Sequence, residues 1–233
     1  YMESVPDNPP LVVILGQTGS GKSALVLKLA QRFNGEIIAA DSRTLYRGMD
    51  IGTAKPTAKE QQLVRHHLID IVDPGQPFTA SDFQRLAKQA IADVASRGKI
   101  PFLVGGSGLY IDAVIYGFSF RQPADRNLRA SLEMLSVAEL QAMASKRGIK
   151  LPENSDNPRH LIRTIETAGE LPNKHALRAN TLVIGLVKEK DALESDMLRR
   201  VHQMLNQGFV DEVKRLSEQY EWDTSALQAP GYK

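Results

Sequence analysis

The chain has 233 residues, of which 42% are hydrophobic and 24% are charged, and its formal net charge is +2. Such a composition is typical of a globular protein that buries a full core, either as one large domain with an insertion or as two small domains. The absence of cysteine excludes a disulfide framework and a thiolate metal site. The longest apolar runs, of about five residues, are far shorter than the ~20 residues that cross a bilayer. We therefore expect a cytoplasmic protein, and the small charge neither supports nor excludes a nucleic-acid partner.

The first half of the chain alternates short apolar strands with helical stretches, which predicts a parallel sheet flanked by helices. Strands are expected at 11–15, 36–40, 68–72 and 100–104, and helices at 23–33 and 81–97, the latter capped by Ser81. Polar or glycine-rich loops after such strands mark the functional edge of the sheet. Asp41, Gly105 and the loop that follows the first strand are therefore expected to lie together at that edge.

The alternation of strands and helices stops after residue 120 and resumes near residue 180. The sequence between them is polar, with helices expected at 128–145 and 158–168. Residues 120–178 hold ten Lys and Arg against seven Asp and Glu, a local net charge of +3. We interpret residues 120–179 as a helical insertion with a mildly basic surface.

The last part of the chain returns to the pattern of the first half. A strand is expected at 181–186, followed by one long helix over 193–220 or by two helices broken near Gly208. The expected fold class is therefore α/β, with a P-loop-like parallel sheet flanked by helices. Its catalytic core is formed by residues 1–119 and 180–233, and the insertion interrupts it.

A glycine-rich turn follows the first apolar strand. Gly16, Gly19 and Gly21 let the backbone curl so that successive N–H groups point into one concavity. A helix that begins near Lys22 adds its positive end. Lys22 places a charge between two phosphates, and the Ser23 hydroxyl can join the coordination shell of Mg²⁺. The pattern favours a phosphorylated ligand over an ordinary strand-to-helix turn, without identifying the phosphate donor or the transferred group.

A second dense group of charged, hydroxyl and glycine residues occupies 41–56, directly after the second expected strand. Asp41 can accept a proton from a nucleophile or bind Mg²⁺ through water. A carboxylate at this position can equally cap the next helix. Taken without its neighbours, Asp41 therefore leaves both interpretations open.

Several blocks of the sequence resemble one protein family, the bacterial tRNA dimethylallyltransferases, also called the IPP transferase family. The matching blocks are 16–23, 41–42, 46–56, 67–70 and 105–110, with Met204, Gly208 and 212–213. The resemblance covers nearly the whole chain, and the block from Asp41 to Pro56 is long and specific. Members of the family continue beyond the last residues of this chain, so the catalytic core is expected to be truncated at its C-terminal end.

The resemblance implies transfer of a dimethylallyl group from dimethylallyl diphosphate to N6 of an adenosine beside the tRNA anticodon. Asp41 would remove the proton from the poorly nucleophilic adenine amine, and Thr18 would donate to the bridging oxygen of the diphosphate. Arg200 would stabilise the departing diphosphate together with Mg²⁺, which is bound through Ser23. The diphosphate-binding residues would be Gly16, Gln17, Thr18, Gly19, Ser20, Gly21, Lys22 and Ser23.

The resemblance also implies a binding surface for tRNA. The target base must leave its stack to react. Residues expected to contact the base or the RNA backbone are Asp41, Ser42, Arg43, Thr44, Ser107, Arg159, His160 and Arg163. Without the resemblance, an arginine pair four residues apart on a helix indicates a solvated face equally well. The partners are thus the anticodon stem-loop and dimethylallyl diphosphate, and the protein is expected to be a monomer.

This chain departs from the family pattern at three positions of the expected core, and in the expected insertion His160 stands where the family has an arginine. Gln17 stands where proline is usual, Thr44 where glutamine is common, and Ser107 in place of threonine. Backbone donors and a hydroxyl survive the first and third changes. The second replaces an amide with a hydroxyl at a residue expected to contact the base.

Two groups of side chains favour structural roles over functional ones. His66 and His67 are adjacent, so in an extended segment they point to opposite faces and cannot chelate one metal together. Tyr46, Tyr110 and Tyr116 are better explained by core packing than by stacking on a base.

Three alternatives to tRNA prenylation stay open at this point. One is a P-loop kinase that uses ATP on a small molecule. Another is an adenylate isopentenyltransferase that acts on free AMP or ATP. The third is an RNA-binding protein that keeps the fold without turnover. A kinase needs a carboxylate at the end of an apolar strand to hold magnesium. After the glycine-rich loop, no strand except the one at Asp41 ends in this way, which counts against the kinase.

Overall fold

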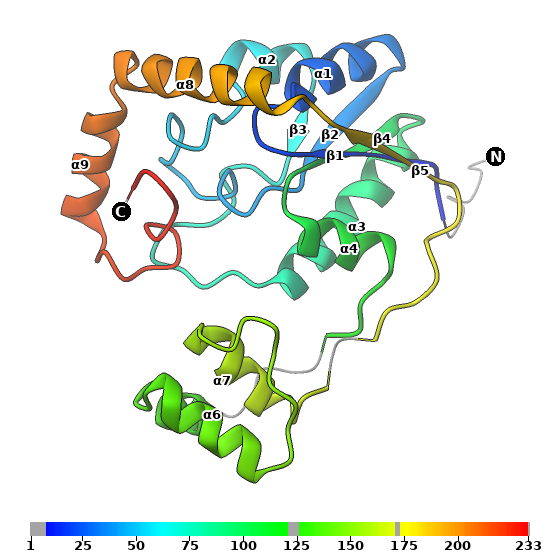
Figure 1. Ribbon diagram of the computed structural model, residues 1–233. Coiled ribbons are helices and arrows are strands. Elements are labelled where there is room, and N and C mark those ends of the chain that lie inside the picture. Colours follow the sequence, from blue (N-terminus) through cyan, green and yellow to red (C-terminus); the bar gives the residue numbers. More distant parts are fainter. Residues whose placement is uncertain (1–7, 121–125, 171–172, 233) are drawn as a thin grey trace. The chain divides into compact units, whose positions relative to one another are not determined.

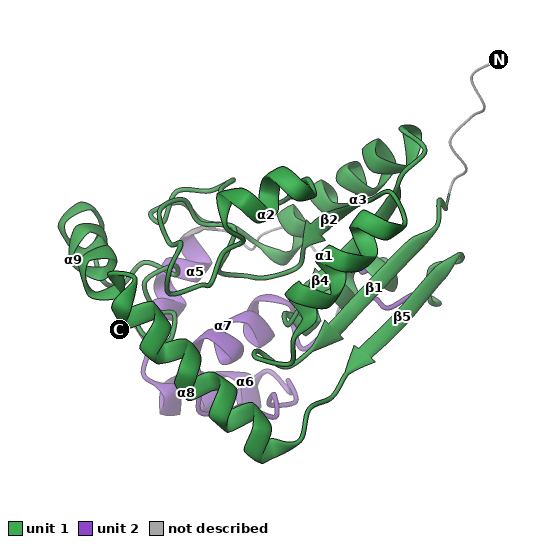
Figure 2. Cartoon of the chain, turned by 90° about the horizontal axis from the view of Figure 1, so that it is seen from above, with its two compact units in different colours: residues 1–117, 176–233 green, residues 118–175 purple. Residues whose placement is uncertain are grey.

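The computed structural model describes residues 8–120, 126–170 and 173–232. Residues 1–7 and 233 of the expected core, and 121–125 and 171–172 of the expected insertion, lie outside the described part. The chain divides into two compact units, coloured separately in Figure 2. The core unit comprises Tyr1–Gly117 and Ala176–Lys233, and the helical unit comprises Phe118–His175.

The core unit is built on a five-stranded sheet in which every paired strand runs parallel to its neighbour (Figure 1). The strand order is β3-β2-β4-β1-β5. The strands are β1 (Leu11–Gly16), β2 (Gly35–Ala39), β3 (His66–His67), β4 (Ile100–Gly105) and β5 (Thr181–Leu186). The expected α/β class is confirmed.

Successive side chains of the strands point to opposite faces of the sheet, and each face has its own hydrophobic core. On one face, Val13 and Leu103 pack with helices α3 (Ala80–Ser96) and α4 (Gly108–Ile115). On the other, their neighbours Ile14 and Phe102 pack with residues of α1 (Lys22–Arg32). Because helices cover both faces, the open edge at the carboxyl ends of the strands is left for a site.

The strand expected at 68–72 is not formed. Leu68 and Asp70 have φ values of +62° and +53°, in the left-handed region that a strand cannot contain. The ladder with β2 is limited to His66–His67, and Val72 makes an isolated bridge to Tyr46. A short apolar run is compatible with either a strand or a buried loop, and here the chain turns to bring Asp70 toward the loop after β2.

The long helix α3 begins one residue before the expected cap. Thr79 is its N-cap: the Thr79 side chain accepts from the backbone N–H of Asp82, and the Asp82 carboxylate accepts from that of Thr79. This reciprocal pair is a capping box, and it satisfies two N–H groups of the first turn. Ser81, the cap expected from sequence, therefore lies inside the helix.

The helical unit contains α5 (Arg126–Glu133), α6 (Val137–Lys146) and α7 (Pro158–Glu166). Leu132, Leu140 and Leu161 are fully buried together in its own core. The single helix expected at 128–145 is wrong, because Ser136 begins a new helix through a capping box with Glu139.

The chain returns to the core unit through β5 and ends in two helices. These are α8 (Lys190–Asn206) and α9 (Phe209–Gln219), joined at Gly208, whose φ is +93°. The expected break near Gly208 is confirmed. The short helix α2 (Ala58–Leu63) lies in the loop region after β2. Within the described residues, helices are too short or too polar to cross a membrane.

Candidate active site

A cavity of about 960 Å³ opens at the carboxyl ends of β1, β2 and β4 in the core unit. Its walls come from the glycine-rich loop (residues 16–23), the loop after β2, the end of β4 and one face of α8. Asp41, Gly105 and the glycine-rich loop thus share one edge of the sheet. Of the site residues expected from sequence, those that line the cavity are Thr18, Gly19, Gly21, Lys22, Ser23, Asp41, Thr44 and Arg200.

The glycine-rich loop has the backbone conformation that its sequence requires. Gly21 is the N-cap of α1 and has a φ of +88°, which is strained for residues with a Cβ atom. The Lys22 ammonium donates to the carbonyls of Gly16 and Gln17, at 2.7 and 2.6 Å. Because α1 begins at Lys22, its unpaired N–H groups and its positive end lie at this loop. The loop is suited to holding an anion.

Three charged side chains at the cavity influence one another. Burial lowers the pKa of Lys22, an effect that the negative charge of Asp41 opposes and the positive charge of Arg200 reinforces. Burial also lowers the pKa of Arg200, again against the opposing charge of Asp41. Two partly desolvated cations at one carboxylate form a site in which additional negative charge is stabilised.

Asp41 is fixed by the backbone that follows it. Its Oδ1 accepts from the N–H of Arg43 at 2.8 Å, and the next residues form turns, so Asp41 does not cap a helix. The N–H of Ser42 donates to Ser107 Oγ at 3.0 Å, and the N–H of Ser107 donates to the Ala40 carbonyl at 3.3 Å. The ends of β2 and β4 are thereby joined, which holds the Asp41 carboxylate at the cavity.

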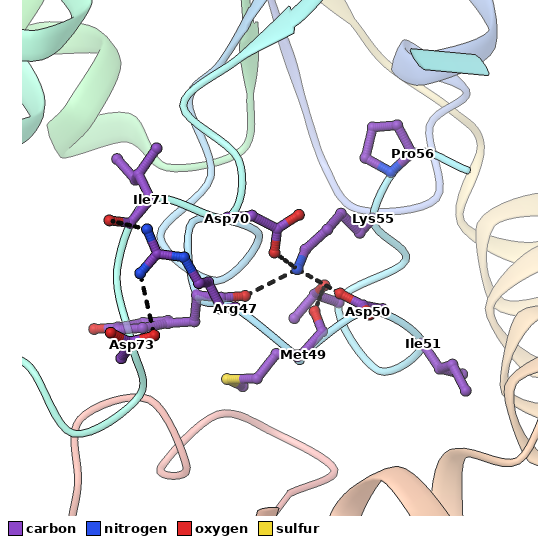
Figure 3. A network of polar contacts seen from close by, with 12 residues as sticks. Arg47, Met49, Asp50, Ile51, Lys55, Pro56, Asp70, Ile71 and Asp73 are labelled. Carbon is purple, nitrogen blue, oxygen red and sulfur yellow. Dashed lines mark hydrogen bonds and ion pairs between the residues drawn. The ribbon is translucent and has the colours of Figure 1, made fainter. Parts of the chain in front are cut away.

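Lys55 is a buried lysine at the cavity wall, and Figure 3 shows its network of polar contacts. Its side chain is 3% exposed, and its ammonium contacts Asp50 Oδ1 and Asp70 Oδ1, each at 2.5 Å. It also donates to the Tyr46 carbonyl at 2.9 Å. A buried charge is stable only when it is paired and hydrogen-bonded. The network thereby fixes the loop after β2 against the loop that contains Asp70.

The histidine pair and the tyrosines have the structural roles expected from sequence. His67 Nε2 lies 2.7 Å from Glu36 Oε2, and His66 Nδ1 lies 2.8 Å from the Val64 carbonyl. Within the described residues, no three His, Cys, Asp or Glu side chains are grouped to hold a metal ion. Tyr110 is buried and stacks on Phe83 with ring centroids 4.2 Å apart, and burial raises its pKa to about 12.

Comparison with known proteins identifies the family. The model of the IPP transferase family matches residues 44–233. The chain belongs to this family. It is 43% identical to the tRNA dimethylallyltransferase of Roseiflexus sp. (strain RS-1), over 96% of this chain and 78% of that protein. It is 39% identical to the tRNA dimethylallyltransferase of Bacillus subtilis (strain 168), over 96% of this chain and 76% of that one.

Solved structures of the IPP transferase family share the fold. The full-length tRNA isopentenylpyrophosphate transferase from Bacillus halodurans has a TM-score of 0.71 and 41% identity, over 96% of this chain and 75% of that one. A eukaryotic dimethylallyltransferase, described as acting on tRNA, has a TM-score of 0.73 and 28% identity, over 92% and 57% of the two chains. The resemblance inferred from the sequence blocks is confirmed.

Six other site residues expected in the core unit do not line the cavity, whereas Thr44 does: Gly16, Gln17, Ser20, Ser42, Arg43 and Ser107. The Arg43 guanidinium donates to the Ser225 carbonyl at 2.6 Å, so this side chain is engaged with the C-terminal segment. Ser20 Oγ and Thr44 Oγ1 are buried and have no hydrogen-bond partner within the described residues. Gly16, Gln17, Ser42 and Ser107 act here through backbone or hydroxyl contacts that shape the loops.

The predicted RNA-backbone residues Arg159, His160 and Arg163 lie on α7 of the helical unit. Arg163 pairs with Glu166 at 3.1 Å, and Arg129 pairs with the same carboxylate at 3.1 Å. The arginines therefore belong to a partly paired helix surface.

Sequence reasoning singled out the dense group at 41–56 and Arg200, but it did not assign the other side chains of two cavity walls to the site. One is the 50–56 loop, which contributes Asp50, Ile51, Thr53, Ala54, Lys55 and Pro56. The other is the face of α8 that carries Gln203, Met204 and Gln207 beside Arg200. Counted from Arg200, these four residues lie at positions i, i+3, i+4 and i+7, the spacing of one helix face, which could have indicated the second wall.

Proposed function

We propose that this chain transfers the dimethylallyl group of dimethylallyl diphosphate to N6 of the adenosine beside the tRNA anticodon. The observation that carries the proposal is the shared cavity of the glycine-rich loop, Lys22 and Asp41, in a member of the IPP transferase family. An anion cradle and a carboxylate in one cavity suit a reaction in which diphosphate leaves and a proton is removed.

The cations of the cavity stabilise the leaving group. An allylic carbon bears positive charge readily, so the barrier lies largely in separating it from diphosphate. The Lys22 ammonium, the N–H groups of the glycine-rich loop and Arg200 bind the charge that develops on the departing oxygens. Thr18 lines the same cavity and donates to the bridging oxygen.

The residues present fit Mg²⁺. Ser23 and Asp41 offer a hydroxyl and a carboxylate to the same cavity. Mg²⁺ is commonly held by one or two protein oxygens together with water and substrate phosphates. When bound through Ser23, it supplies charge neutralisation at the diphosphate.

Asp41 is the general base. The adenine N6 lone pair is delocalised into the ring, so its nucleophilicity rises as the proton is removed. The N6–C bond forms, the C–O bond to diphosphate breaks, the N6 proton passes to Asp41, and diphosphate leaves with the bonding electrons. The loop contact with Arg43 N–H holds the carboxylate for this task.

The acceptor base is extruded from its stack to reach Asp41. Ser42, Thr44 and Ser107, next to Asp41 on the loops after β2 and β4, are the proposed contacts of the base. Arg43 would join them after releasing the Ser225 carbonyl. Arg159, His160 and Arg163 on α7 are the proposed contacts of the RNA backbone. We further propose that the protein acts as a cytoplasmic monomer.

An assay that offers several acceptors tests this function. The chain is incubated with Mg²⁺ and labelled dimethylallyl diphosphate, together with an unmodified anticodon stem-loop and free AMP. We expect label in the stem-loop alone. Label in AMP would favour an adenylate isopentenyltransferase. Phosphorylation of small hydroxylated compounds by ATP, with no prenyl transfer, would favour the kinase.

A further inference from the structure

A buried carboxylate on α9 binds the backbone of the 50–56 loop. Glu212 is 6% exposed. Its Oε2 accepts from the N–H groups of Asp50 and Ile51, each at 2.9 Å, and its Oε1 accepts from that of Gly52 at 3.1 Å. The Tyr232 hydroxyl donates to Oε1 at 2.6 Å. Three successive N–H groups of the loop therefore converge on one side chain that is distant in sequence.

The packing around these hydrogen bonds is tight. A Cβ atom on Gly52 would lie 2.3 Å from Phe209 Cε2 and 2.6 Å from the Tyr232 hydroxyl oxygen, so glycine is required there. The Phe209 and Tyr232 rings meet edge to face at 5.2 Å. In Figure 1 the C-terminal segment runs back beside α9. The loop, α9 and the C-terminal segment form one packed block.

The loop of this block also lines the cavity, through Asp50 and Ile51 among others. Thr53 and Lys55 line the cavity from the loop, and Arg200 lines it from α8. Arg200 Nη2 lies 3.5 Å from the Thr53 carbonyl oxygen. Arg200 lies on α8 and Glu212 on α9, and these consecutive helices are joined at Gly208. The helix that binds the loop therefore directly follows the helix that carries Arg200.

We propose that Glu212 is a positioning residue for prenyl transfer, which holds the 50–56 loop and the Arg200 side chain in register around the diphosphate. This inference rests on the proposed function. Glu212 is not among the residues that line the cavity, so it acts through the loop. A buried carboxylate carries a desolvation cost that an apolar contact avoids. In return, the four hydrogen bonds that the Glu212 carboxylate accepts from neutral donors fix the position of the loop backbone relative to α9.

The test compares two buried carboxylates. Glu212→Gln keeps the side-chain volume but replaces the negatively charged carboxylate, which accepts four hydrogen bonds, with a neutral amide. Glu36→Gln is the matched control, because Glu36 is 1% exposed, accepts from charged partners and does not line the cavity. Turnover, tRNA affinity, melting temperature and amide exchange at residues 50–52 are measured for both. Tyr232→Phe, which removes one of the four donors, is a milder variant.

We expect kcat to fall by about ten- to a hundredfold in Glu212→Gln, as a small misplacement of reactive groups produces. The affinity for tRNA should stay unchanged, and amide exchange at residues 50–52 should accelerate. Glu36→Gln should lower the melting temperature at least as much while leaving kcat and this exchange unchanged, and Tyr232→Phe should lie between wild type and Glu212→Gln.

A kcat of Glu212→Gln equal to that of the wild type would overturn the inference. So would an equal loss of kcat in Glu36→Gln, because it would show general destabilisation. If the wild-type chain transfers no prenyl group, the proposed function fails, and the affinity for inorganic diphosphate with Mg²⁺ decides the inference. We then expect weaker diphosphate binding in Glu212→Gln than in Glu36→Gln. Equal affinities of the two variants for diphosphate would contradict the positioning role of Glu212.

Discussion

The Asp41 side chain, the proposed general base, is held in a defined orientation at the cavity. One of its oxygens is occupied by the N–H of Arg43, which fixes the orientation of the carboxylate. The loop that carries it is tied to Ser107 after β4. The charges of Lys22 and Arg200 interact with it across the cavity. In the proposed reaction, a carboxylate held in this way needs no rearrangement before it accepts a proton.

Asp41→Asn should lower kcat by about 10² to 10⁴, the usual contribution of a positioned general base. The amide oxygen can still accept from Arg43, so the loop should keep its shape and the affinity for tRNA should be retained. Single-turnover prenyl transfer and filter binding measure the two quantities. Asp73→Asn is the control, because Asp73 pairs with Arg47 outside the cavity and should leave both unchanged. Equal losses of rate and binding in Asp41→Asn would show that the role is structural.

The sequence predicts cavity residues whose signal is local, and it misses contacts between residues that are distant in the chain. The glycine-rich loop and Asp41 follow directly from short patterns next to strands. Lys55 pairs with Asp70, 15 residues away, and Glu212 bonds the N–H of Asp50, 162 residues away. A lysine or glutamate gives no sign of such a partner, because both residue types are common on solvated surfaces.

At the level of elements, hydrophobic periodicity is reliable where packing on one face decides the structure. The strand expected at 181–186 is β5 with the same bounds, and the strands at 11–15 and 100–104 each extend by one glycine. The errors occur at 68–72 and at 134–136, where positive φ values and a capping box redirect the chain. Backbone hydrogen bonds from residues 70–72 to the loop after β2 hold the first segment, and a capping box starts a new helix at the second. Hydrophobic periodicity reports neither kind of contact.

Glu36 connects several elements at the other end of the sheet. This β2 side chain is 2% exposed and accepts from Arg97 Nη2 at 2.7 Å, just after α3, and from Lys99 Nζ at 2.8 Å, just before β4. His67 of β3 contacts it at 2.7 Å. The hydrogen bonds from Arg97, followed by those of Lys99 and His67, lower the pKa of Glu36 well below its ordinary value, against the effect of burial.

Glu36→Gln should reduce the free energy of unfolding at pH 7 by about 1–3 kcal/mol, because the partly exposed donors Arg97 and Lys99 lose a buried, charged acceptor. A carboxyl whose pKa is depressed by folding stabilises above its unfolded pKa, here 4.5, and loses this contribution as the pH falls below it. Urea unfolding at pH 7 and at pH 3 should therefore show a smaller difference between wild type and variant at the lower pH. Asp93→Asn, an exposed partner of Arg97, should change stability little at either pH.

A pH-independent difference between wild type and Glu36→Gln would contradict this account. It would show that the carboxyl titrates equally in the folded and unfolded chains, and that the variant acts through packing.

At the scale of the whole molecule, two units with separate cores share one chain. The core unit contains the sheet, the cavity and the block formed by α9 and the C-terminal segment. The helical unit has its own buried cluster, and the chain enters and leaves it between residues 117 and 176. An insertion with an independent core can carry a surface for a large partner without altering the packing of the cavity.

Substitutions of two arginines that pair with one glutamate in the helical unit test whether that partner is RNA. Arg129 and Arg163 contact the same Glu166 carboxylate and are about equally exposed, at 48% and 45%. Arg163→Ala should weaken tRNA binding more at low salt than at high salt. The slope of log affinity against log salt should become shallower by about 0.7–0.9 for each lost phosphate contact. Arg129→Ala removes an ion pair with the same carboxylate and should leave the slope unchanged. If both variants lose affinity equally and independently of salt, Arg163 acts by supporting Glu166 and the fold of the unit, and its role as a phosphate contact is refuted.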